Sequence, residues 1–296
     1  MINFTGITTE ACKNIVLAGI GSITIADEGL VQIEDLGAGF FFRDEDVGKQ
    51  RVHAGRDRIN SLNPRVQVIG ISEQVSTKIT DIEFLKTFNV VCLNDSNSFV
   101  ISEVNTACRK AGVPLFVSGC LGLDGYLFVD LIDHTYLRVK DVGFGGEKTQ
   151  EKKCQKFVHF SEMLEGSLNH VTPRRHKKIS PMLLGCLALF QFQASHEGML
   201  PQGSDDLPAL VEICDQVIKK RNLQQVSTPT TILERLCQSS GAEFVATCAI
   251  VGSVMSQEVL NVLGAQQPPV VNLFVFDGQR CAGDVYALGA LRIEPW

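Results

Sequence analysis

Short apolar segments alternate with longer segments of helical pattern through the first half of the chain. Four β-prone runs lie at residues 23–26, 66–69, 90–93 and 115–118, each bounded by polar or turn residues. Helical segments lie before or between them at residues 10–18, 47–62 and 99–111, and Gly112 follows the last of these where a C-terminal cap would be. Strands that alternate with helices predict right-handed crossovers, and therefore an α/β fold with a doubly wound, mostly parallel sheet.

The pattern changes after residue 140. A glycine-rich stretch at residues 143–146 and the polar residues 147–156 have the composition of a loop, and residues 157–160 look like a strand that returns to the sheet. The next region contains clear helices at 181–194 and 207–220 without strand alternation. We therefore divide the chain into residues 1–160, a helical insertion at 161–240, and a closing part at 241–296.

The closing part consists of one long helix and one strand. Residues 243–263 form a mostly apolar helical segment, and residues 272–276 form a final core strand. Four small residues of the helix, Ala246, Ala249, Ser253 and Ser256, share one face because they are three or four positions apart. We expect this face to contact either a partner subunit or the central sheet, and we favour an internal seam against the sheet, because closing helices of such folds usually pack on their own sheet.

Composition excludes several classes of protein. The 296 residues carry a net charge of −6, so no overall basic field attracts nucleic acid or an anionic membrane. We expect no bilayer-spanning segment, and the first residues do not form a secretory leader pattern. The ten cysteines contain no C-x-x-C pair, which argues against structural zinc and favours reduced thiols in an intracellular protein.

The turn from Asn3 to Thr8 lies where a nucleotide loop would be in such a fold. Glycines at this turn let a backbone approach phosphate, and the helix N-terminus attracts its charge. Only Gly6 is a glycine here, although Asp27 is suitably placed to bind a ribose. The competing interpretation is an ordinary turn in which a threonine caps the helix.

Several motifs together resemble the ubiquitin-like-protein activating enzymes, which have a ThiF-type adenylation fold. The resemblance rests on residues 13–25, 34–42, 46–49 and 59–64, and on residues 248–259 and 272–278 near the end. It covers nearly the whole chain and keeps the order of the motifs. The short length and modest insertion are most similar to the smaller, non-catalytic subunits of the SUMO-activating enzymes.

The resemblance implies a heterodimer in which only one subunit has a complete ATP site. In that family, a catalytic subunit binds ATP and magnesium and adenylates the C-terminal glycine of the modifier, and a degenerate subunit supports it. We therefore expect this chain to bind no cofactor, to meet SUMO only through the complex, and to occur in the nucleus and cytoplasm. The family's degenerate subunits begin with a helical segment that carries an arginine, so we expect such a segment to precede this sequence.

The chain departs from the active pattern at several positions. The three loop glycines of the active subunits fall on Asn3, Gly6 and Thr8, and the second acid of a D-x-D element falls on Gly29. A phosphate-binding arginine at the end of the 35–38 element is replaced by Ala38, the expected lysine is Arg51, and the magnesium-binding acid falls near Asp95 and Ser96. Adenylation needs cations and a metal around the phosphates, so these losses together argue against catalysis.

Other interpretations stay open. The chain could serve ubiquitin or another ubiquitin-like modifier, or it could be a self-sufficient nucleotide-binding enzyme. Cys120 follows a strand, where reactive residues can lie, but we interpret it as a small buried residue. The basic run at residues 174–178 could act in nuclear import or bind an acidic partner, but we favour its interpretation as a solvated helix entry at the boundary of the insertion.

Overall fold

A computed structural model describes residues 1–140, 149–168, 178–223 and 225–289 of the chain. The first half contains, in order, α1 (Gly6–Leu17), β1 (Ser22–Ala26), α2 (Asp35–Ala38), α3 (Arg51–Leu62), β2 (Gln67–Ile71), α4 (Val75–Lys78), α5 (Ile82–Leu85), β3 (Val91–Asn94), α6 (Ser98–Ala111), β4 (Leu115–Leu121), β5 (Asp124–Asp130) and β6 (Asp133–Lys140). The second half contains β7 (Thr149–Lys156), α7 (Phe160–Glu165), α8 (Pro181–Ser195), α9 (Leu207–Lys220), α10 (Thr230–Ser239), α11 (Val245–Gly264), β8 (Leu273–Asp277) and β9 (Ala282–Tyr286).

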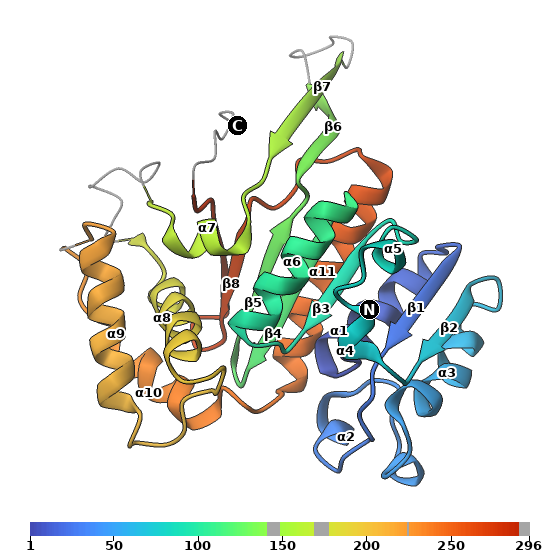
Figure 1. Ribbon diagram of the computed structural model, residues 1–296, viewed down its shortest axis with the longest axis horizontal. Coiled ribbons are helices and arrows are strands. Elements are labelled where there is room, and N and C mark those ends of the chain that lie inside the picture. Colours follow the sequence, from blue (N-terminus) through green and yellow to red (C-terminus); the bar gives the residue numbers. More distant parts are fainter. Residues whose placement is uncertain (141–148, 169–177, 224, 290–296) are drawn as a thin grey trace.

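A twisted central sheet runs through the molecule, with helices on both faces (Figure 1). β1 pairs with β2 and β3 pairs with β4, both in parallel. Ile2 joins these pairs because it forms parallel bridges to Ala26 and to Leu93. The α/β class and the four strands predicted in the first half are confirmed.

The other half of the sheet is antiparallel, so the sheet is mixed rather than mostly parallel. β5 lies antiparallel to β4, β8 to β5, and β9 to β8. The direction reverses at the tight turn after β4, where Gly122 has a φ of +67°. A two-residue turn of this kind makes a hairpin, whereas a parallel pair would need a long crossover.

The segment between residues 133 and 160 differs from its prediction. β6 and β7 pair from Asp133↔Lys156 to Lys140↔Thr149 and form a hairpin that projects from the body of the molecule (Figure 1). The expected polar loop is therefore a strand in its second half, while residues 141–148 lie outside the described residues. The expected strand at 157–160 is wrong too, because Phe160 begins α7. His159 is the N-cap residue of this helix, and its side chain accepts a hydrogen bond from Ser161 N–H.

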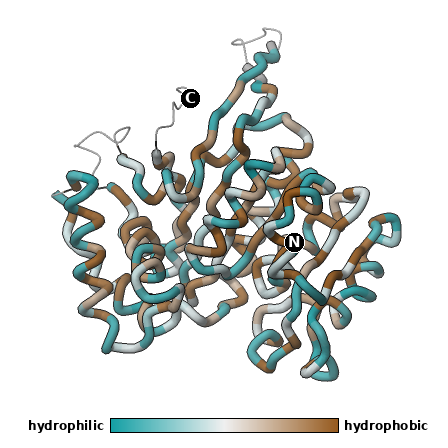
Figure 2. Tube along the Cα trace, in the orientation of Figure 1, coloured by the Kyte–Doolittle hydropathy of each residue, from teal (hydrophilic) through white to brown (hydrophobic). Residues whose placement is uncertain are grey.

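The helices predicted at 181–194 and 207–220 are confirmed as α8 and α9. α8 is apolar nearly all round, and it packs against α6, α9 and β8. Figure 2 shows this concentration of apolar residues in α8 and in the central strands. Together with α9 and α10, α8 forms a helical layer beside the antiparallel half of the sheet (Figure 1).

The closing helix α11 is long and apolar enough to cross a membrane by length and composition, contrary to our expectation. In the fold it packs along α1 and against β4 and β5, with Cys248, Val251 and Met255 fully buried. A side chain at Gly252 would lie 2.8 Å from the Ile7 carbonyl oxygen, so α1 and α11 are in close backbone contact. The length and apolarity of α11 are therefore those of a core helix.

The small-residue face of α11 is only partly internal. Ser256 is buried and its hydroxyl accepts a hydrogen bond from Asn14 Nδ2 at 3.2 Å. Ala246 and Ser253 are exposed, and Ala249 is half-buried. The expected internal seam along all four residues is therefore wrong, because the buried face of the helix is centred on Cys248, Val251 and Met255 instead.

Candidate functional site

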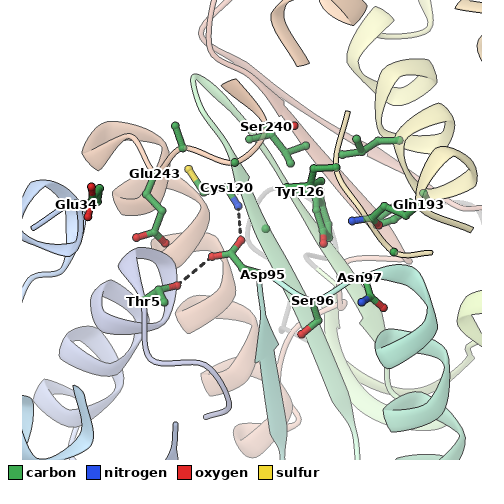
Figure 3. A pocket seen from close by; sticks show the side chains of 18 of the residues that line it. Thr5, Glu34, Asp95, Ser96, Asn97, Cys120, Tyr126, Gln193, Ser240 and Glu243 are labelled. Carbon is green, nitrogen blue, oxygen red and sulfur yellow. Dashed lines mark hydrogen bonds between the residues drawn. The ribbon is translucent and has the colours of Figure 1, made fainter. Parts of the chain in front are cut away.

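A cavity of about 670 Å³ opens where the carboxyl ends of β3 and β4 meet the N-terminus of α1 (Figure 3). Its other walls come from the end of α8, the loop that follows it, and the segment between α10 and α11. Parallel strands place ligand sites at this edge of a sheet. The polar side chains that line it include Thr5, Asp95, Ser96, Asn97, Tyr126, Gln193, Ser240 and Glu243.

The turn before α1 is held by its own polar side chains. Asn3 has a φ of +60°, and its amide donates hydrogen bonds to the Asn94 carbonyl at 2.7 Å and to Ser96 Oγ at 3.2 Å. Thr5 occupies the N-cap of α1, and its N–H donates to the Thr8 hydroxyl at 3.0 Å. The competing interpretation of a threonine-capped turn therefore describes the local geometry of Asn3 and Thr8.

A carboxylate occupies the position at which a nucleotide loop would bind phosphate. The N–H of Gly6, the first residue of α1, donates to both carboxylate oxygens of Glu243, at 2.8 and 3.0 Å. A side chain on Gly6 would lie 2.6 Å from Cys248 Sγ and 3.0 Å from Glu243 Oε1. Gly6 therefore makes room for the beginning of α11, and the positive end of α1 is already paired with an anion.

Asp27 supports backbone rather than facing the cavity. Its carboxylate accepts the N–H of Phe4 at 2.6 Å and the N–H of Gly29 at 2.5 Å. Arg51 lies 3.6 Å from the same carboxylate and makes two hydrogen bonds to Asp35, at 2.9 and 3.2 Å. These carboxylates and their hydrogen bonds raise the pKa of Arg51, although burial opposes the shift. Its guanidinium is therefore already paired within the protein and is not free to bind a phosphate.

Asp95 lies in the wall of the cavity, and its side chain is exposed to the cavity. Its oxygens accept hydrogen bonds from Cys120 N–H at 3.0 Å, the Thr5 hydroxyl at 3.0 Å and Asn94 Nδ2 at 2.7 Å. The pKa of Asp95 is raised to about 7. The largest cause is loss of hydration, and the second is the negative charge of Glu243. Asp95 Oδ2 accepts two of these hydrogen bonds and Oδ1 accepts the third, so few lone pairs remain for a magnesium ion.

The cavity is acidic. Glu34, Asp35, Asp95 and Glu243 line it, and no lysine, arginine or histidine does so among the residues that the structure describes. The position of the expected phosphate-binding arginine is Ala38, which is buried in an apolar cluster with Ile7 and Ala11. The residues present therefore do not fit ATP and magnesium, because they supply negative charge where the phosphates would need positive charge.

Cys120 is a buried residue, in agreement with our interpretation. Its sulfur donates to the Gly122 carbonyl at 3.5 Å and accepts the N–H of Phe244 at 3.4 Å. Its hydrogen bond to Cys248, with burial, raises the pKa of the Cys248 thiol. All ten cysteines are free. The basic run begins within residues 169–177, which lie outside the described residues.

The structure brings together some predicted residues and adds others. Asp95 and Ser96 line the cavity, whereas Asn3, Gly6, Thr8 and Asp27 lie around the turn beside it. Sequence reasoning missed Tyr126, Gln193, Ser240 and Glu243. A single acid before the closing helix was the only available signal for Glu243, and it indicates no contact with a glycine 237 positions earlier.

The chain is similar to several known proteins along most of its length. The chain is 29% identical to the DNA damage tolerance protein RHC31 of Saccharomyces cerevisiae, over 94% of this chain and 86% of that protein. It is 28% identical to SUMO-activating enzyme subunit 1 of Dictyostelium discoideum (95% and 84% covered) and of Homo sapiens (98% and 88% covered). The model of the ThiF family matches residues 5–287. This chain therefore belongs to the ThiF family.

Proposed function

We propose that the chain is the non-catalytic subunit of a heterodimeric SUMO-activating enzyme. Its catalytic partner would bind ATP and magnesium and would adenylate SUMO, while this chain supports the partner without binding a nucleotide. Relatives named SUMO-activating enzyme subunit 1 cover almost the whole chain, which supports the assignment to SUMO.

The observation that carries the proposal is the pairing of Glu243 with Gly6 N–H. A triphosphate at this helix N-terminus would have to displace a carboxylate and then lie beside Asp95. At 4 Å, two like charges at a protein surface repel by about 4 kcal/mol. Arg51, at the position of the expected lysine, already pairs with Asp35 and Asp27. These contacts support a site without adenylation chemistry.

An exposed apolar surface on α11 supports the heterodimer. Phe244, Val245 and Ile250 are large apolar residues with 40–48% of their surface exposed, and the small residues Ala246 and Ser253 lie exposed beside them. Clusters of this kind are typical of protein interfaces. We infer that the partner covers this α11 face, defined here as Phe244, Val245, Ala246, Ile250 and Ser253.

The proposal includes a nuclear and cytoplasmic location. The basic run at residues 174–178 is the sequence feature that supports import into the nucleus. Microscopy of the tagged chain with and without this run replaced by alanine would measure its contribution.

Pyrophosphate exchange tests the catalytic part of the proposal. The purified chain is expected to show no ATP–pyrophosphate exchange with SUMO present, because its site repels the phosphates. The same chain mixed with a purified catalytic subunit of a SUMO-activating enzyme is expected to support SUMO-dependent exchange. Robust exchange by the chain alone would contradict the proposal, and so would failure to assemble with that subunit.

A further inference from the structure

Two buried polar atoms at the cavity have no hydrogen-bond partner among the described residues. They are Gln193 Oε1, at the end of α8, and Ser240 Oγ, at the end of α10. Their residues are only 5% and 4% exposed, and both line the cavity. A buried polar atom without a partner is costly, so such atoms commonly meet a ligand or an ordered water.

The two side chains lie around the same space as the acidic residues. In Figure 3, the amide of Gln193 turns toward the cavity beside Tyr126, and Asp95 and Glu243 lie across it near Thr5. Rotation about the last bond of Gln193 exchanges its oxygen and nitrogen, so either atom of the amide can face the cavity. Polar side chains from several elements, two of them carboxyls, therefore lie around one space.

The remaining wall is apolar. Leu189, Phe190 and Leu200 line the cavity beside the ring of Tyr126, which packs edge to face on Phe190 with the ring centroids 5.0 Å apart. The volume of about 670 Å³ is within the range of small-molecule sites, which is roughly 300–1,000 Å³. The occupant is thus expected to have both an apolar body and a polar end.

We propose that this cavity binds an organic cation, an ammonium or guanidinium group carried on an apolar stem. Such groups are donors without acceptors, which complements the unpartnered oxygens and the carboxyls. A phosphate is the reverse, an anion that only accepts. The stem would lie along Leu189, Phe190 and Leu200. The proposed role of the chain does not require this site, and the two proposals stand or fall separately.

Titration calorimetry with matched probes tests the proposal on the full chain, together with any subunit that co-purifies. The probes are N-acetylarginine methylamide and the neutral N-acetylcitrulline methylamide, which has nearly the same shape. The arginine probe is expected to bind at least about tenfold more tightly than the citrulline probe, because citrulline lacks the charged donor group. Equal binding of both probes, or no saturable binding of the arginine probe up to about 10 mM, overturns the proposal.

Two variants locate the binding. Gln193→Met and Ser240→Ala remove polar atoms that have no protein partner. Each variant is therefore expected to bind the arginine probe several-fold more weakly, without a lower melting temperature. Gln191→Met is the control, because Gln191 belongs to the same helix but does not line the cavity. Unchanged binding in both cavity variants would show that the cavity holds water only, and would overturn the proposal.

A third probe distinguishes the sources of the cation. Agmatine carries the guanidinium on a free alkylamine, whereas the arginine probe carries it on a peptide backbone. Tighter binding of agmatine supports a free small molecule, and tighter binding of the arginine probe supports a basic side chain of a polypeptide. Either result is consistent with the proposed site.

Discussion

At the scale of single residues, the site is governed by two adjacent carboxyls. Asp95 and Glu243 lie 148 positions apart in the sequence. Asp95 accepts a hydrogen bond from the N–H of Cys120, and Glu243 accepts one from the N–H of Gly6. Tyr126 and Cys248 nearby have raised pKa values, so they are uncharged at neutral pH. Glu243 is therefore the charged group that faces Asp95 most directly.

Replacement of Asp95 should change how stability depends on pH. The pKa of Asp95 is about 7 in the folded chain and near 3.8 ordinarily, so the folded state holds its proton more tightly. The free energy of unfolding should therefore fall as pH rises from about 4 to 7, and this contribution should vanish in Asp95→Asn. Urea unfolding at pH 5 and pH 8 measures it. Asp57→Asn, on the exposed face of α3, is the control and should keep the wild-type dependence.

At the scale of elements, the contact between α1 and α11 organises both the core and the site. The two helices approach most closely where Gly252 faces the Ile7 carbonyl, and the same packing brings Glu243 to the N-terminus of α1. Any change that separates the helices should therefore affect stability and the shape of the cavity together.

Gly252→Ala tests this packing. The added methyl group would lie 2.8 Å from a backbone oxygen and 2.9 Å from Glu10 Cβ, so the helices must move apart. Overpacking of this kind costs about 1–3 kcal/mol, which chemical denaturation can measure. Gly264→Ala is the matched control, because no atom lies within 4 Å of the added methyl group. Equal stability of the two variants would show that the seam can relax without cost.

At the scale of the whole molecule, one side of α11 is buried and the other faces out. The buried side completes the core over β4 and β5. The α11 face presents apolar and small residues, and Ser253 within it is exposed. A larger residue at Ser253 should therefore leave the fold intact and act only on an interaction with a partner.

Ile250→Glu examines that interaction directly. Exposed substitutions usually change stability by less than about 0.5 kcal/mol, so the melting temperature should hold. A charge within an interface should weaken binding to the catalytic subunit by about tenfold or more, as measured by calorimetry or pull-down. Ile69→Glu, on β2, has the same 40% exposure and serves as the control. Unchanged binding in Ile250→Glu would place the partner elsewhere.

The sequence by itself determined the local elements and the family. Apolar periodicity located α6 and α9, and a long apolar run without strand alternation located α8. Gly112, with a φ of +74°, ends α6 as a left-handed cap. These features depend on neighbours within a few positions, which is why a linear pattern predicts them. The motifs that carry the family resemblance are likewise contiguous.

Only the tertiary structure decided what lies across the site. The sequence does not indicate that Glu243 pairs with Gly6, that the β6–β7 hairpin projects, or that Ser253 is exposed while Ser256 is buried. Each of these facts depends on which distant segments pack together. A polar strand with both faces near solvent has the composition of a loop, and a helix with apolar residues on all sides does not show which side is covered. The long-range packing of α1, α11 and the sheet settles these points, because it brings together groups that are hundreds of residues apart.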